Sequence, residues 1–301
     1  MHYIIQKNVF KEENYNKIFT ALDRLGLSYE IVDCLPFLED YEFISDRKDI
    51  FPFGSVKMAR LSAKNNWVPG SFYGGNHDFT IYSKEYGINL LNSGSIICEF
   101  GDKTIWDNGF IRLNMMLFIR PCKDSKVFTG KLFTQTKWED FVQESLTNGH
   151  TTSLDSNTLI QVAIPKKIYK EARVWVIGGK IITSSYYFFH GNIDYEENVE
   201  PEGLEFAQKM IDLYQPAEAF VIDICLCELG WKIVEINCIN CSGFYKGDLQ
   251  KILIGLEDHF NPSPIVGDDM ICPITKTHCY DECCPVGATC NLWGNNIKSI
   301  N

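Results

Sequence analysis

The chain has 301 residues, of which 45% are hydrophobic and 22% are charged, so it is long enough for about two domains with a sizeable core. Its formal net charge of -11 argues against a nucleic-acid-binding surface but leaves room for a locally basic phosphate site. No N-terminal signal peptide is visible, and no apolar run approaches the ~20 residues that cross a bilayer, so we expect a cytoplasmic protein.

The first 95 residues begin with a strand–helix–strand pattern. An apolar strand at residues 3–5 precedes side chains at helical spacing, and Gly26 is expected to end that helix. A second strand follows at residues 29–32, which predicts a small parallel α/β domain over residues 1–95. Farther along, Ser55 is expected to cap a helix.

The polar pair His77-Asp78 allows two interpretations: it contacts a substrate, or it caps the helix that runs through Tyr82 and Tyr86. The pattern favours the cap.

Strands then follow at residues 96–100 and 116–121, and the second ends with Arg120. The loop after it contains glycine and carries three lysines: Lys123, Lys126 and Lys131. Such a loop binds polyphosphate through charge and backbone amides, although it lacks the spacing of a P-loop. An ordinary solvated loop is the alternative.

Two more strands meet at a hairpin turn formed by Gly178-Gly179. On the first of them, Glu171 and Arg173 share one face. The pair is either a solvent-facing ion pair, which the pattern alone favours, or a phosphate-stabilising arginine that a carboxylate orients.

A third hairpin joins residues 220–227 to residues 231–237. If its turn has three residues with Gly230 in the left-handed conformation, Cys227 faces Trp231 and Asp223 faces Glu235. Opposed carboxylates repel unless a cation lies between them, and Asn237 adds an oxygen on the face of Glu235, which together suits Mg²⁺. The alternative is a surface hairpin, since a two-residue turn would shift the register and separate Asp223 from Glu235.

Cysteines occur in two groups. Near the third hairpin, Cys238 and Cys241 have zinc-ligand spacing, but the positions there favour buried thiols. The second group lies in a short tail, residues 263–301, with His278 beside it: Cys272, Cys279, Cys283, Cys284 and Cys290. In a reducing compartment this cluster predicts Zn²⁺ before disulfides, although its spacing is irregular; a disordered thiol-rich end and adventitious disulfides are alternatives.

Three separated segments now resemble one family, the ATP-grasp enzymes. They are the strand ending Phe118-Ile119-Arg120-Pro121 with its lysine loop, the hairpin at Glu171-x-Arg173, and Asp223…Glu235-x-Asn237. Arg120 resembles the clade in which arginine replaces the usual nucleotide-binding lysine. Three N-terminal segments also resemble that clade: Phe53-Gly54-Ser55, Asn76-His77-Asp78-Phe79 and Leu90-Leu91-Asn92-Ser93.

The resemblance covers roughly residues 1–260 and implies a mixed α+β and α/β architecture: a pre-ATP-grasp α/β domain (1–95), an ATP-grasp domain (96–262) and the Cys-rich tail. Within the ATP-grasp domain, residues 96–160 would form the small subdomain and residues 161–262 the large one.

The resemblance also implies roles for individual residues. Asp223, Glu235 and Asn237 would hold Mg²⁺, and Arg173 would stabilise the transferring phosphoryl group or an acylphosphate. The remaining assignments concern the nucleotide and the substrate: Arg120, Lys126 and more weakly Lys131 at the phosphates, the backbone of Val162, Ala163 and Ile164 at adenine, and Ser184 and Tyr186 on the substrate side.

The implied activity is an ADP-forming carboxylate–amine ligase that uses ATP and Mg²⁺, acts through an acylphosphate, and takes amino acids, peptides or other small carboxylates and amines as partners. A kinase on the same fold and a non-enzymatic nucleotide- or peptide-binding module are the alternatives. Formation of an amide product separates the ligase from the kinase.

Overall fold

The computed structural model describes residues 1–7, 9, 13–33, 43, 45–107, 115–124, 127–147, 154–189 and 191–262. Residues Met1–Gly255 form one compact unit and Leu256–Asn301 a second. The cysteine-rich tail, and with it the predicted Zn²⁺ site, lies outside the described residues. None of the described helices is long and apolar enough to cross a membrane.

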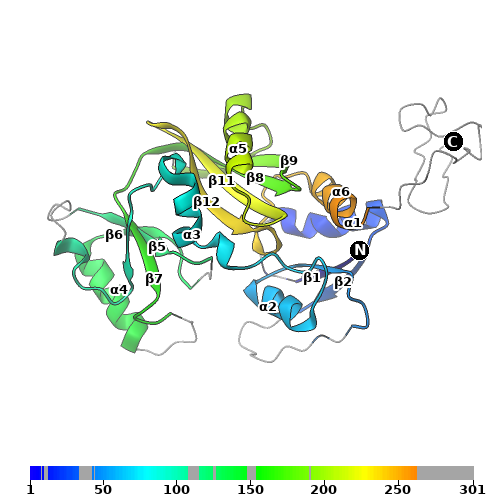
Figure 1. Cartoon of the computed structure of the whole chain (residues 1–301), viewed down its shortest axis with the longest axis horizontal. Coiled ribbons are helices and arrows are strands. Elements are labelled where there is room, and N and C mark those ends of the chain that lie inside the picture. The colour runs from blue at the N-terminus through cyan, green and yellow to red at the C-terminus, as the bar shows by residue number, and fades with distance from the viewer. Residues whose placement is uncertain are drawn as a thin grey trace, which may run out of the picture. The chain divides into compact units, whose positions relative to one another are not determined.

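The N-terminal sheet has three parallel strands in the order β2-β1-β3 (Figure 1). They span His2–Gln6 (β1), Ser28–Val32 (β2) and Ile50–Phe53 (β3). Helix α1 (Lys17–Leu25) links the first two strands, and α2 (Val56–Asn65) follows the third. This arrangement confirms the predicted parallel α/β unit.

Two of the predicted helix boundaries are confirmed, and one is made differently. Gly26 ends α1 with φ 63°, and the Asp78 side chain caps α3 (Phe79–Tyr86) by accepting from the backbone N of Thr80 at 2.9 Å. Ser55 stands at the N-cap position of α2 but does not bond the helix through its side chain. Its Oγ and its backbone N both donate to Gln6 Oε1 at 2.8 Å, which fastens this turn to β1 instead.

A second sheet has four antiparallel strands in the order β4-β7-β5-β6. They span Ile96–Glu99 (β4), Leu117–Pro121 (β5), Lys131–Phe133 (β6) and Leu159–Ala163 (β7). Helix α4 (Gln135–Thr147) packs on this sheet through Trp138, whose ring lies edge-on to Phe133 and Phe100.

The third sheet has five antiparallel strands in the order β10-β9-β8-β11-β12. They span Ile168–Ile177 (β8), Lys180–Phe189 (β9), Asn192–Glu196 (β10), Ala219–Cys227 (β11) and Gly230–Cys238 (β12). Helix α5 (Pro201–Leu213) and helix α3 pack their apolar side chains into the core of this sheet (Figure 1).

The remaining described helices are short, apart from α6. They are α6 (Leu249–Phe260) and the 3-10 turns Glu13–Asn16, Gly75–His77, Gly87–Asn89, Ile105–Asp107 and Ile239–Cys241.

These sheets bear on the predicted subdomain boundaries, which stay a prediction. Strand β7 crosses the boundary at residue 160 and belongs to the four-stranded sheet. Helix α3 and Leu90 share a core with the five-stranded sheet, although they fall within the predicted domain 1–95. Contact with the later sheet therefore begins well before residue 95.

The β11–β12 hairpin pairs Asp223 with Glu235, as expected, by a different route from the one expected. Near the turn the register differs by one residue, because Cys227 pairs with Gly230 and not with Trp231. The register shifts between Asp223 and Ile224, where Val234 is the extra residue of a β-bulge. The short connection alone would have separated the two carboxylates, and the bulge brings them back into register.

We predict that Gly26→Ala destabilises the protein by about 1–2 kcal/mol, because a side chain there has space but must adopt a left-handed backbone (φ +63°). Urea unfolding measures the loss. The matched control is Gly74→Ala, since Gly74 also has open space but an extended backbone. An equal loss in both variants would contradict the conformational explanation.

Candidate active site

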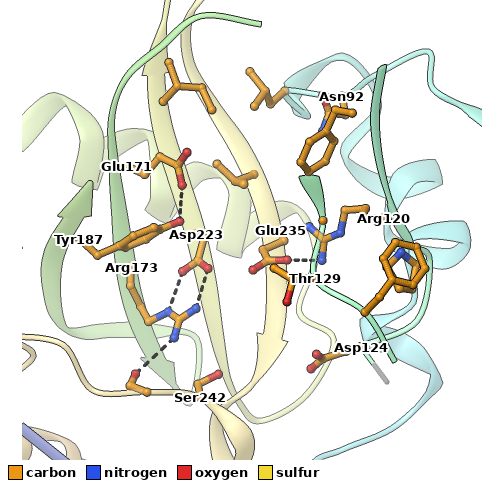
Figure 2. A pocket seen from close by; sticks show the side chains of 18 of the residues that line it. Asn92, Arg120, Asp124, Thr129, Glu171, Arg173, Tyr187, Asp223, Glu235 and Ser242 are labelled. Atoms are coloured by element: carbon orange, nitrogen blue, oxygen red, sulfur yellow. Dashed lines mark hydrogen bonds and ion pairs between the residues drawn. The ribbon is translucent and has the colours of Figure 1, made fainter. Parts of the chain in front are cut away.

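A cavity of about 720 Å³ opens between side chains of β5, β8, β9, β11 and β12 (Figure 2). Its size lies within the range of ligand-binding pockets. The loops at residues 123–130 and 241–245 complete its lining. Polar and charged groups from segments far apart in the chain converge on it: Arg120, Lys123, Asp124, Lys166, Glu171, Arg173, Asp223 and Glu235.

The most buried charges in this cavity are a bidentate ion pair. Arg173 Nε and Nη2 donate to Asp223 Oδ1 and Oδ2 at 2.9 and 2.8 Å, and Arg173 Nη1 donates to the carbonyl of Gly243 at 3.3 Å. Arg173 is 6% exposed and Asp223 is 0% exposed. Burial opposes the charge on Arg173, but the carboxylate outweighs it and the pKa of Arg173 is raised. The carboxylate that orients Arg173 is thus Asp223, and the solvent-facing ion pair with Glu171 is excluded.

A second ion pair joins the two sheets. Arg120, at the end of β5, pairs with Glu235 on β12 (Figure 2). Asn237 Nδ2 donates to Glu235 Oε1 at 3.0 Å and to Asp223 Oδ2 at 3.2 Å. One amide therefore reaches both carboxylates, and the structure brings together the three residues that the sequence predicted as a metal site.

The donor set fits a magnesium ion. Within the described parts of the chain, no group of three or more His, Cys, Asp or Glu could hold a metal, since this set has two carboxylates and one amide. Mg²⁺ is bound through one or two carboxylates and keeps waters and phosphates as its other ligands. Rotation of the Asn237 amide by half a turn would present its oxygen beside those of Asp223 and Glu235.

Glu171 occupies a different part of the same wall. Its Oε2 accepts from the Tyr187 hydroxyl at 2.6 Å (Figure 2). Burial raises the pKa of Glu171 to about 7, the nearby charges of Asp223 and Glu235 add to this, and the bond from Tyr187 opposes it. A carboxyl that titrates near neutrality inside a cavity is typical of functional sites.

Rings of two tyrosines form the floor beside it. Tyr187 and Tyr245 stack with centroids 4.9 Å apart, and the Arg173 guanidinium lies 4.6 Å from the Tyr245 centroid. Sequence reasoning missed both tyrosines.

The substrate-side prediction selected the neighbouring residues, Ser184 and Tyr186. Neither lines the cavity, and Tyr186 is 2% exposed in the core. Extending the two-residue turn after Ile177 without a bulge would pair Arg173 with Ser184. A register shift between Trp175 and Val176 instead pairs Arg173 with Ser185, which exchanges the two faces of β9 and brings Tyr187 to the cavity.

The remaining predicted residues are less central. In β7, Val162 and Ala163 are buried and Ile164 after them is exposed, while Pro165 and Lys166 line the cavity. Lys131 lies outside the lining, with its Nζ 5.0 Å from the Phe133 centroid and 5.2 Å from the Phe141 centroid. Lys126 lies outside the described residues. These three roles stay predictions.

The cysteines beside the site are free thiols. Cys225, Cys227, Cys238 and Cys241 are all buried. Since the described residues contain no metal-binding group of His, Cys, Asp and Glu side chains, the preference for buried thiols is supported.

Residues 76–255 match a family described as an ATP-grasp domain, family 3 of the clade named for its arginine-to-lysine difference. The match covers more than half of the chain, so the protein belongs to the ATP-grasp superfamily, and within it to this family. No curated protein matches the sequence.

The fold resembles solved ATP-grasp structures at low sequence identity. The D-alanine–D-alanine ligase from Bacillus anthracis aligns with 87% of this chain and 94% of its own, at 14% identity and a TM-score of 0.54. The D-cycloserine synthetase DcsG aligns over 86% and 99%, at 9% identity and a TM-score of 0.55. The ATP-grasp ligase PsnB, complexed with a minimal precursor, aligns over 86% and 98%, at 9% identity and a TM-score of 0.53. These likenesses confirm the ATP-grasp fold.

We predict that Asp223→Asn lowers the free energy of unfolding by roughly 3–5 kcal/mol, because it leaves the buried Arg173 charge without its partner. Urea unfolding measures the loss. The double variant Asp223→Asn/Arg173→Gln should regain part of it. If the loss in the double variant equalled the sum of the losses in the two single variants, the pair would not be coupled.

We also predict that Glu171→Gln changes the pH dependence of stability. The pKa of Glu171 is raised from 4.5 to about 7 by folding, so its stabilising contribution is complete below about pH 4.5 and is lost as the pH rises through 7. The variant should therefore gain Tm relative to the wild type between pH 5 and pH 8. Glu228→Gln, at an exposed position in the hairpin turn, is the control and should show no such gain.

Proposed function

We propose that the protein is an ATP-dependent carboxylate–amine ligase that forms ADP through an acylphosphate. The observation that carries the proposal is the convergence of Arg120, Arg173, Asp223, Glu235 and Asn237 in one cavity, within residues that belong to an ATP-grasp family. Positive groups for phosphates and oxygen ligands for a metal are what phosphoryl transfer from ATP requires.

The chain's own residues divide the work. Asp223, Glu235 and Asn237 would hold Mg²⁺, which when bound neutralises phosphate charge. Arg120 enters the cavity from β5 and Arg173 from β8, so guanidinium groups from two sheets flank the space for the phosphates. In the proposed complex Arg120 contacts the α- or β-phosphate with Lys126, and Arg173 contacts the transferring group.

The reaction has two balanced steps. A carboxylate oxygen of the first substrate attacks the γ-phosphorus of ATP, and the bond from that phosphorus to the bridging oxygen breaks to release ADP. The amine nitrogen of the second substrate then attacks the acyl carbon, a C–N bond forms, and the C–O bond to phosphate breaks. The proton lost by the amine leaves with phosphate.

The substrates proposed are amino acids or peptides. Two structural neighbours are described as a D-alanine–D-alanine ligase and as a ligase complexed with a minimal precursor, which supports this class at the level of the fold. The cavity has room for a nucleotide and small reacting groups.

Release of ADP tests the proposal. We expect ADP, not AMP, when the protein is incubated with Mg-ATP and a panel of amino acids and dipeptides, and an amide product by mass spectrometry. AMP would indicate adenylation, and a phosphorylated product without an amide would indicate a kinase. No ATP binding at all would contradict the proposed function.

Glu235→Gln should reduce ATP turnover by at least about 100-fold while leaving the fold intact, because it removes a metal-binding oxygen charge and the partner of Arg120. Turnover is measured by ADP release, and folding by circular dichroism. Glu228→Gln provides the same chemical change at an exposed position and should keep wild-type turnover. Normal turnover in Glu235→Gln would contradict the metal assignment.

A further inference from the structure

Glu171 is the cavity carboxylate that the proposed mechanism leaves without a role. The other three in the described lining have a charged or backbone partner: Asp223 with Arg173, Glu235 with Arg120, and Asp124 with the backbone N of Cys238. Glu171 accepts only from the neutral hydroxyl of Tyr187 among the described residues. Its negative charge thus faces the cavity without a compensating cation on the described part of the protein.

The surroundings of Glu171 suit an organic cation. Tyr187 and Tyr245 line the cavity with stacked rings. The same rings already hold one such cation, since the Arg173 guanidinium lies 4.6 Å from the Tyr245 centroid and 5.9 Å from the Tyr187 centroid. Ring faces attract ammonium and guanidinium groups, most strongly where water is excluded.

The position of this subsite along the strand is also suitable. Glu171 and Arg173 are two residues apart on β8, so their Cα atoms are separated by about 6.6 Å on the same side of the sheet. A ligand held at Glu171 therefore lies next to the arginine that binds the transferring group. In Figure 2, Glu171, Tyr187 and Arg173 follow one another along this wall.

We propose that Glu171, with the ring faces of Tyr187 and Tyr245, binds the amine nucleophile of the ligation in its ammonium form. This inference rests on the proposed function and names the substrate class of that site: a primary amine that arrives as a cation, in preference to a neutral nucleophile. Charge and cation–π attraction select the cation, and Arg173 next to it holds the electrophile. The ammonium passes one proton to the Glu171 carboxylate before the nitrogen attacks, and the second proton leaves with phosphate.

The test compares two small nucleophiles, methylamine and hydroxylamine, with Mg-ATP and the carboxylate that releases most ADP in the panel. At pH 7 methylamine is an ammonium ion and hydroxylamine is neutral. For Glu171→Gln we expect the KM for methylamine to rise on the order of 10-fold to 100-fold, since a charge-assisted contact is lost. The KM values for hydroxylamine and ATP should change less than about 3-fold.

Two further variants frame the result. Glu171→Asp retains the negative charge and should keep most of the preference for methylamine, which also serves if Glu171→Gln does not fold. Glu228→Gln should leave every KM unchanged.

Other outcomes would overturn the inference. A rise in the KM for ATP alone would show that Glu171 binds the nucleotide, for example a ribose hydroxyl. Equal losses for methylamine and hydroxylamine would show a structural role. If the wild-type protein releases no ADP with any carboxylate and nucleophile, the proposed function itself fails, and this inference with it.

Discussion

The buried ion pair between Arg173 and Asp223 is the interaction on which the rest of the site depends. It joins neighbouring strands β8 and β11, where the two residues are direct partners in the ladder. A buried charge is tolerated only when it is paired and hydrogen-bonded, so each member requires the other. The third donor of Arg173 fastens the loop at Gly243, and the amide of Asn237 reaches the same carboxylate. Register, loop position and cavity shape are therefore coupled through one guanidinium group.

The N-terminal sheet is tied to this centre through a single buried side chain. Asn240 follows directly after β12, and its Nδ2 donates to the carbonyls of Pro52 at 2.8 Å and Gly70 at 3.2 Å. Its Oδ1 accepts from the backbone N of Phe72 at 2.9 Å. Segments from the first 75 residues are thus hydrogen-bonded to the end of the strand that carries Glu235 and Asn237. The order of the sequence, with the α/β unit first and the metal-binding strand last, closes into one unit by this contact.

Charge in the cavity is balanced unevenly. Arg120 and Arg173 offset Glu235 and Asp223, while Glu171 is offset only by a phenol among the described residues. Binding of a polyphosphate with its metal would redistribute the first two pairs, because arginines and carboxylates then have stronger partners of their own. The raised pKa of Glu171 shows that folding maintains this carboxyl at a cost in stability, which is a common property of groups retained for function.

Much of this protein was legible in the sequence, since local patterns determine strands, helix ends and the order of elements. The helix stop at Gly26, the cap at Asp78 and the residues Arg120, Arg173, Asp223, Glu235 and Asn237 were predictable from spacing and from resemblance to the ATP-grasp family. Tertiary structure alone decided which faces meet. The extra residue at Val234 preserved one predicted pair, and a shift beside Trp175 placed Tyr187 in the cavity where Ser184 and Tyr186 were expected. A strand alternates its faces at every residue, so a single bulge reverses all that follows, and bulges depend on long-range packing that local pattern does not contain.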